Sequence, residues 1–190
     1  MNVKQFPTEV TKALAWPFDF DIKRVSRGAI SRGVFEFTIS PPVKLTPLAG
    51  DGAGGVYAQL MDSGEILFVD SEGAGGVIAP DLKGLILLFV CHPYWRDLLK
   101  FSGGGTLAEM RRTLPYAERD YYEDEPEARM LGAMIRKKLD LPDVSDVVGV
   151  LHASVASSSK RLTLSGSDGC KYDSLFGQFT ANSNPAWRRA

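Results

Sequence analysis

The chain has 190 residues, of which 44% are hydrophobic and 10% aromatic, so it has enough apolar surface for a folded core and disorder is excluded as the default. Its 22 basic and 23 acidic residues give a formal net charge of −1, which gives no electrostatic reason to expect direct binding to nucleic acid. The most apolar run, LILLFVC, is far shorter than the roughly 20 residues that span a bilayer, and MNVKQFPTEV lacks the apolar stretch of a signal peptide, so we expect a cytoplasmic protein with no membrane partner.

A short helix and three strands are predicted in the first half of the chain. The helix covers Glu9–Trp16 and is stopped by a proline. VFEFTI at 34–39 alternates in the manner of a half-buried strand, and two prolines follow it. Val56–Met61 and Glu65–Asp70 flank the turn sequence DSG, so this unit is predicted to be a β-hairpin.

Two glycine-rich loops, GDGAGG at 50–55 and SEGAGG at 71–76, border this hairpin. The first fits the G-x-G-x-x-G spacing of a dinucleotide-binding turn, and Asp70 ends a later apolar run, where such a fold would hold a ribose-binding acid. A crossover connection between two parallel strands needs about a dozen residues or more, most of them in a helix. Too few residues separate Gly55 from the next strand to form such a connection. The run before the loop contains Pro47, a poor residue for a central strand. We therefore interpret the first loop as a glycine turn that opens a hairpin.

The second half of the chain is predicted to be mostly helical. Leu82–Phe101 is strongly apolar, and the proline within it predicts a kink or a restart. A GGG sequence, predicted to be a flexible connector, follows. Thr106 and Glu109 fit a capping box, which starts a helix that we expect to end near Pro115. Further helices are predicted at Glu127–Leu139 and Val144–Ser157.

A second hairpin is predicted near the C-terminus. Arg161–Leu164 and Cys170–Phe176 bracket the sequence SGSDG, which ends in the strong turn signal Asp-Gly. The tail after Phe179 is predicted to be loose, with Trp187 as the residue that would pin it.

Few residues suit catalysis or metal binding. Cys91 and Cys170 form no C-x-x-C pair, and we interpret both as small core residues in a reducing compartment. Cys91 and His92 are helix neighbours that point about 100° apart, so they cannot form a dyad with each other. A Cys91–His152 pair and a glycosidase-type carboxylate pair stay open, although nothing in the sequence favours them. The ligand spacing fits neither zinc nor an EF-hand, so we expect no metal and no cofactor.

One acidic segment, YAERDYYEDEPEA at 116–128, contains a single basic residue. It is either a solvated loop between helices or a docking surface on which tyrosines supply contact area and acids steer a basic partner. The candidate partner-binding residues are Tyr121, Tyr122, Glu123, Asp124 and Glu125.

The phrases PLAGDGAGGVYAQL and GEILFVDSEGAGGVIAPDLKGLILLF resemble the SUKH superfamily, which includes yeast Smi/Knr-type cell-wall regulators and many bacterial immunity proteins. The family's turn residues correspond to Gly50, Asp51, Gly52, Gly54, Gly55 and Glu72, to which we assign a structural role. A closing phrase, YDSLFG, is similar to one seen in some members. The resemblance covers about a quarter of the chain, and Asp70 stands where many relatives carry glycine.

The resemblance implies one α+β domain over residues 1–190, with a mixed, mostly antiparallel sheet and helices packed largely on one side. It also implies a protein without enzymatic activity, which binds and neutralises a cognate toxin domain such as a nuclease. Two other functions stay open. One is a small-molecule or nucleotide-binding protein that uses the glycine loops, and the other is a regulatory scaffold of the Smi/Knr type.

Overall fold

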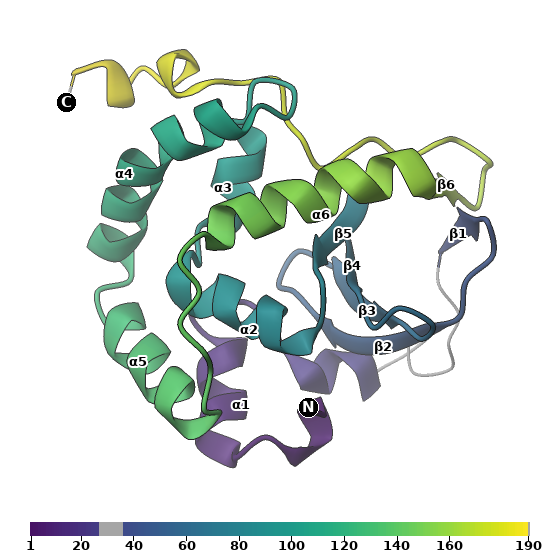
Figure 1. Cartoon of the computed structure of the whole chain (residues 1–190), viewed down its shortest axis with the longest axis horizontal. Helices are drawn as coiled ribbons and strands as arrows, with labels where there is room; N and C mark the ends of the chain where they lie inside the picture. Colours follow the sequence, from purple (N-terminus) through teal and green to yellow (C-terminus); the bar gives the residue numbers. More distant parts are fainter. Residues whose placement is uncertain (27–35, 190) are drawn as a thin grey trace.

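The computed structural model describes residues 1–26 and 36–189, so part of the strand predicted at 34–39 lies outside the described residues. The helices are α1 (Thr8–Ala15), α2 (Leu82–Cys91), α3 (Trp95–Lys100), α4 (Leu107–Asp124), α5 (Ala128–Lys138) and α6 (Val147–Arg161). The strands are β1 (Phe37–Ser40), β2 (Leu45–Gly50), β3 (Val56–Leu60), β4 (Ile66–Val69), β5 (Gly75–Ala79) and β6 (Thr163–Gly166). The predicted α+β class is confirmed. In Figure 1 the strands lie together on the right, α1, α4 and α5 lie on the left, and α6 runs above β5.

The predicted hairpin of β3 and β4 is confirmed, and it forms the centre of an antiparallel four-stranded sheet with the order β2-β3-β4-β5. Pro47 lies in β2, at the edge of this sheet, where the register with β3 shifts between Pro47 and Ala49. A proline removes one donor from a strand, and an edge strand tolerates that loss. In this sheet β3 therefore has a neighbouring strand on each side, whereas β2, which contains the proline, has one neighbouring strand, β3.

The four-stranded sheet is covered on both faces. In β4, Ile66 and Phe68 pack with the helices, in the same cluster as Phe89 of α2. Leu67 and Val69, which point the opposite way, pack against the two-stranded sheet of β1 and β6. Burial on both faces accounts for a strand that reads as an uninterrupted apolar run.

The outer edge of β5 is also covered. Gly75 and Gly76 belong to β5, which corrects the longer glycine loop predicted from the sequence. The backbone N–H of Val77 donates to the hydroxyl oxygen of Ser158 in α6 at 3.0 Å, and the N–H of Gly75 donates to the carbonyl of Asp173 at 3.0 Å. A helix and the C-terminal segment thus take up donors that an open edge would leave unpaired.

The second predicted hairpin is formed in part, next to its turn. β6 pairs with β1 along its whole length. On the returning segment, an antiparallel bridge joins Lys171 to Ser165, and the N–H groups of Gly166 and Tyr172 donate to the carbonyls of Cys170 and Leu164, both at 2.9 Å. Further along, Asp173 bridges to Ala74 instead. β1 brings Phe37 and Ile39 against the apolar side chains of the larger sheet, and Tyr172 of the returning segment packs against the same cluster.

The predicted break at Pro93 is confirmed, because α2 ends at Cys91 and α3 starts at Trp95. Asp81 caps α2 by accepting a hydrogen bond from the N–H of Gly84 at 2.8 Å. Within residues 1–26 and 36–189, no helix combines the length and apolarity that crossing a membrane requires.

The helix predicted to end near Pro115 continues to Asp124 as α4. Pro115 and Arg111, whose carbonyl loses its helical donor, both lie on the exposed side of the helix. Water can solvate that carbonyl, while Met110 and Ala117 anchor the opposite side in the core. Thr106 is the N-cap as predicted, but its side chain makes no capping hydrogen bond, so the capping box is not formed.

The C-terminal tail is pinned by Trp187, as predicted. Its ring stacks on Tyr116 with centroids 5.5 Å apart, and its indole N–H donates to Asp120 at 2.6 Å. The GGG connector is fixed to the same segment, because Gly103 and Gly104 donate to carbonyls of residues 179 and 177 at 2.7 and 2.8 Å. These contacts correct the prediction of a flexible connector.

His92, at the end of α2, makes stability depend on pH. Burial lowers its pKa, although Glu118 and Asp146 act in the opposite direction. His92 therefore binds a proton less readily in the folded protein than in the unfolded chain. The free energy of unfolding should consequently fall as the pH falls below about 6.5. His92→Gln should reduce this loss, measured by urea unfolding at about pH 7.5 and about pH 5.5. Equal losses for variant and parent would contradict the assignment to His92.

Candidate functional site

The GDGAGG loop closes around the carboxylate of Asp51. One oxygen of this carboxylate accepts the backbone N–H of Ala53 at 3.0 Å and that of Gly55 at 2.6 Å. The N–H of Asp51 donates to the carbonyl of Gly55 at 3.0 Å. Asp51 is only 3% exposed, so these hydrogen bonds lie inside the protein. The loop's amides satisfy a buried carboxylate, whereas a phosphate cradle would present them to a ligand.

The second loop repeats this arrangement around Asp70. Asp70 Oδ1 accepts the N–H groups of Glu72 at 2.9 Å and Ala74 at 2.8 Å, and the N–H of Asp70 donates to the carbonyl of Ala74 at 2.9 Å. The third residue after each aspartate is a glycine with positive φ, 97° at Gly54 and 92° at Gly73. The shared pattern D-x-x-G was visible in the sequence, and it marks two equivalent turns.

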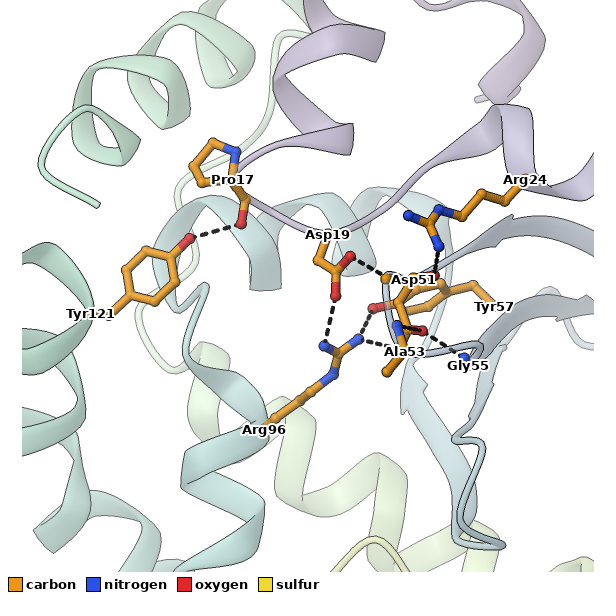
Figure 2. Close-up of polar contacts among 10 residues, drawn as sticks. Pro17, Asp19, Arg24, Asp51, Ala53, Gly55, Tyr57, Arg96 and Tyr121 are labelled. Atoms are coloured by element: carbon orange, nitrogen blue, oxygen red, sulfur yellow. Dashed lines mark hydrogen bonds and ion pairs between the residues drawn. The ribbon is translucent and has the colours of Figure 1, made fainter. Parts of the chain in front are cut away.

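Arg96 of α3 joins the first loop to the N-terminal segment, as Figure 2 shows. Its guanidinium donates to Asp19 at 3.1 Å, to Asp51 at 2.9 Å and to the hydroxyl of Tyr57 at 2.7 Å. Asp19 also accepts the N–H of Gly52 at 2.7 Å. The same guanidinium lies 5.0 Å from the ring centroid of Phe68. Three segments that are distant in sequence are thus fixed by one side chain.

The electrostatics of this network leave it with one net negative charge, because one guanidinium faces the two carboxylates of Asp19 and Asp51. Burial raises the pKa of Tyr57, so its hydroxyl stays protonated. Burial alone would lower the pKa of Arg96, but Tyr57, Asp51 and Asp19 outweigh it and the pKa lies above its ordinary value. The guanidinium is therefore a permanent cation whose charge is already matched by two anions.

Both glycine loops line an open groove of about 1000 Å³. Phe68, Trp95 and Arg96 are among its lining residues. One wall is the second glycine loop, and the other, which we call the C-terminal wall, is the segment 173–179. The two walls meet at Asp173, which is hydrogen-bonded to Gly73 and Gly75. This size is at the upper end of the range for ligand pockets, which is about 300–1,000 Å³.

The groove carries an excess of negative charge. Asp70, Glu72 and Asp173 line it, and none of them forms a salt bridge within the described residues. Lys100 is the cation on its rim, and Arg96 is neutralised as described above. An apolar surface lies beside these acids, because Phe179 on the C-terminal wall is 54% exposed.

The predicted partner-binding segment lies elsewhere, at the C-terminal end of α4. It is helical and therefore not the loop that was considered. Tyr121 donates its hydroxyl to the carbonyl of Pro17 at 3.0 Å, and Tyr122 lies under the guanidinium of Arg129 at 3.8 Å from the ring centroid. Both tyrosines are half-buried and pack against the core. Their rings therefore already make contacts within the protein, which leaves less aromatic surface for a partner.

The acids of that segment remain accessible. Glu123 and Asp124 are exposed, and Glu125 is half-buried. None of the three forms a salt bridge within the described residues. These three acids stay candidate contacts for a basic partner. The tyrosine surface that was predicted to lie beside them is largely packed against the core.

The residues considered for catalysis are not brought together. Cys91 Sγ accepts from Arg136 at 3.1 Å, whereas His152 Nε2 lies 2.8 Å from the carbonyl of Gly105, so the pair left open from the sequence does not form. Cys170 is exposed and Cys91 half-buried, which corrects the prediction that both are core residues. In residues 1–26 and 36–189, no group of three or more His, Cys, Asp or Glu side chains could hold a metal ion.

Sequence reasoning missed Arg96 and Asp173. Arg96 is 45 positions from Asp51, and nothing in the intervening sequence indicates their contact. Comparisons of the chain with protein-family models, with curated proteins and with solved structures gave no match. The family resemblance is carried by the quoted residues alone.

The first loop allows a direct test of its packing. A Cβ added at Gly55 would lie 2.5 Å from Asp51 Oδ2 and 2.9 Å from a ring carbon of Phe68. Gly55→Ala should therefore lower the free energy of unfolding by about 2 kcal/mol. Gly52→Ala is the control, since its nearest neighbour is an oxygen of Asp19 at 3.3 Å, and should change stability by less than about 0.5 kcal/mol. Urea unfolding measures both, and equal effects would contradict this account.

Proposed function

We propose that this chain is a protein-binding domain without enzymatic activity, and that the groove between its glycine loops and residues 173–179 is part of the surface that contacts its partner. One observation carries the proposal. The groove combines three carboxylates that lack salt-bridge partners among the described residues with an exposed aromatic side chain, Phe179. Exposed apolar surface beside unpaired charge is typical of interaction sites.

The SUKH resemblance supports a narrower form of this proposal. In this form, the chain is a cytoplasmic bacterial immunity protein that occludes a toxin domain such as a nuclease. Nuclease domains present basic surfaces to nucleic acid, and the unpaired acids of the groove and of Glu123 and Asp124 would complement such a surface. The separate hydrogen-bond partners of Cys91 and His152 agree with binding rather than catalysis.

A nucleotide-binding role for the glycine loops is disfavoured by their geometry. Asp51 and Asp70 occupy the amide groups that would hold a phosphate, and the groove's unpaired acids repel one. A Smi/Knr-type scaffold would use the same kind of surface as an immunity protein, and only the identity of the partner separates the two.

The test is co-expression with a toxin domain encoded beside this protein. We expect cells to survive, and a stable complex to elute from gel filtration. Continued killing without a complex would overturn the immunity proposal. Thermal unfolding with ATP or NAD tests the alternative, because binding at 100 times Kd stabilises by about 2.7 kcal/mol. We expect no such shift.

A further inference from the structure

We propose that the groove receives an extended segment of the partner protein through a basic side chain, which contacts the acids Asp70, Glu72 and Asp173 where the two walls meet. This inference rests on the proposed function and specifies the chemistry of the partner. It assigns a role to the C-terminal segment 173–179, of which the sequence alone placed the part up to Phe176 in the second strand of a hairpin.

The charges on the two walls favour a cation. The glycine-loop wall carries Asp70 and Glu72, and the C-terminal wall carries Asp173. Lys100 offsets one of these charges, and the Arg96 network adds one negative charge of its own. A ligand with a positive side chain therefore gains from both walls, and a focused field of one sign also speeds its association.

The walls are held in place by backbone contacts between them. The N–H of Asp173 donates to the carbonyl of Gly73 at 2.8 Å, and the N–H of Gly75 donates back to the carbonyl of Asp173 at 3.0 Å. The backbone of Asp173 is therefore fixed beside the loop of Asp70 and Glu72. A fixed backbone costs less reorganisation on binding than a mobile one.

The apolar part of the groove favours a peptide segment over a small cation. Leu175, Phe176 and Phe179 all line it, and Phe179 is largely exposed. A small polyamine would leave this surface uncovered. A chain segment that carries a basic side chain between apolar ones would cover it.

The geometry disfavours an anionic occupant. Arg96 donates to Asp19, Asp51 and Tyr57, so its guanidinium already faces two carboxylates and offers less attraction to a phosphate than an unpaired arginine would. An anion in this groove would meet Asp70, Glu72 and Asp173, and of the two cations among its lining residues Arg96 is paired with carboxylates and Lys100 lies over the ring of Phe101.

The first experiment uses the full chain labelled with ¹⁵N and the peptide Ac-Leu-Arg-Leu-NH₂. We expect amide shifts confined to residues 70–76, 95–100 and 173–179. The peptide with citrulline in place of arginine is the neutral control and should cause much smaller shifts. Equal shifts from both peptides, shifts centred on α4, or a response to ADP at the same residues would each overturn the inference.

The second experiment uses Glu72→Gln with Asp173→Asn. These exposed side chains make no side-chain hydrogen bond in the described structure, so folding should be retained. Peptide binding should weaken by a factor of about two to five for each carboxylate. The matched control, Glu123→Gln with Asp124→Asn, removes the same charge from α4 and should leave peptide binding unchanged. The reverse ranking would overturn the inference.

Binding of the parent and of the groove variant to the toxin domain distinguishes a failure of this inference from a failure of the proposed function. If the toxin complex forms and the groove variant binds it as tightly as the parent does, the groove inference fails and the protein-binding function stands. If the arginine peptide binds in the groove but no toxin complex forms, the immunity function fails and the groove inference stands.

Discussion

Arg96→Met is expected to lower the free energy of unfolding by about 3 kcal/mol, because it leaves the carboxylate of Asp51 buried without its cation. The change also removes the donors to Asp19 and Tyr57. The guanidinium side chain is 41% exposed, so the loss should lie at the lower end of the range for buried pairs. Urea unfolding of the variant and the parent measures it.

A second substitution tests the cause of that loss. Asp51→Asn in the Arg96→Met background removes the unpaired charge, and the asparagine oxygen can still accept from the amides of Ala53 and Gly55. The double variant should therefore be more stable than Arg96→Met alone by about 1 kcal/mol. Lys138→Ala, which breaks an exposed pair with Glu9, should cost less than about 1 kcal/mol. A double variant less stable than Arg96→Met would contradict the buried-charge explanation.

Gly177→Ala is expected to lower the free energy of unfolding by about 3 kcal/mol, at the upper end for overpacking, because the added Cβ would overlap the backbone carbonyl of Lys100. The backbone cannot give way as a flexible side chain can. Gly177 also donates to the carbonyl of Leu99 at 2.9 Å and accepts from Ser102 and Gly104 at 3.1 and 2.8 Å. Relief of the overlap would break these bonds and release the C-terminal wall of the groove.

The control for this substitution is Gly169→Ala. Gly169 has a φ of 81° but no atom within 4 Å of an added Cβ, so only backbone strain of about 1 kcal/mol is expected. Thermal unfolding compares the two variants. Peptide binding should also be weaker in Gly177→Ala than in Gly169→Ala. Equal stability and equal binding would contradict the role of close backbone packing at residue 177.

Local signals predicted most of the elements correctly. The strand pattern and the DSG turn predicted β3 and β4, Pro93 predicted the break between α2 and α3, and the apolar periodicity of 127–139 predicted α5. A helix was also predicted at 144–157, where α6 covers Val147–Arg161. These features depend on neighbouring residues, which the sequence displays directly. Where a prediction failed locally, as at Pro115, the outcome depended on which side of the helix faced solvent.

Pairing between distant segments was harder to predict. The turn at SGSDG and the short pairing beside it were predicted, but the strand that pairs with β6 along its whole length is β1, more than 100 residues earlier, as the pairing of Thr38 with Ser165 shows. A turn signal indicates only the partner next to it, and the sequence does not show which distant strand lies along the other edge. The tyrosines of the acidic segment were also harder to place from the sequence. Tyr121 and Tyr122 pack against the core, and Tyr121 donates its hydroxyl to the carbonyl of Pro17.

The sequence by itself determined the α+β class, the hairpin, and the structural role of the glycine turn, because the short distance from Gly55 to the next strand excludes a crossover helix. The tertiary structure decided the content of the site. It turned the loop amides inward to Asp51 and Asp70, placed Arg96 between two carboxylates, and brought Asp173 against the second loop. These contacts join segments far apart in the chain, and each depends on burial and on charges that become neighbours only when the core is formed.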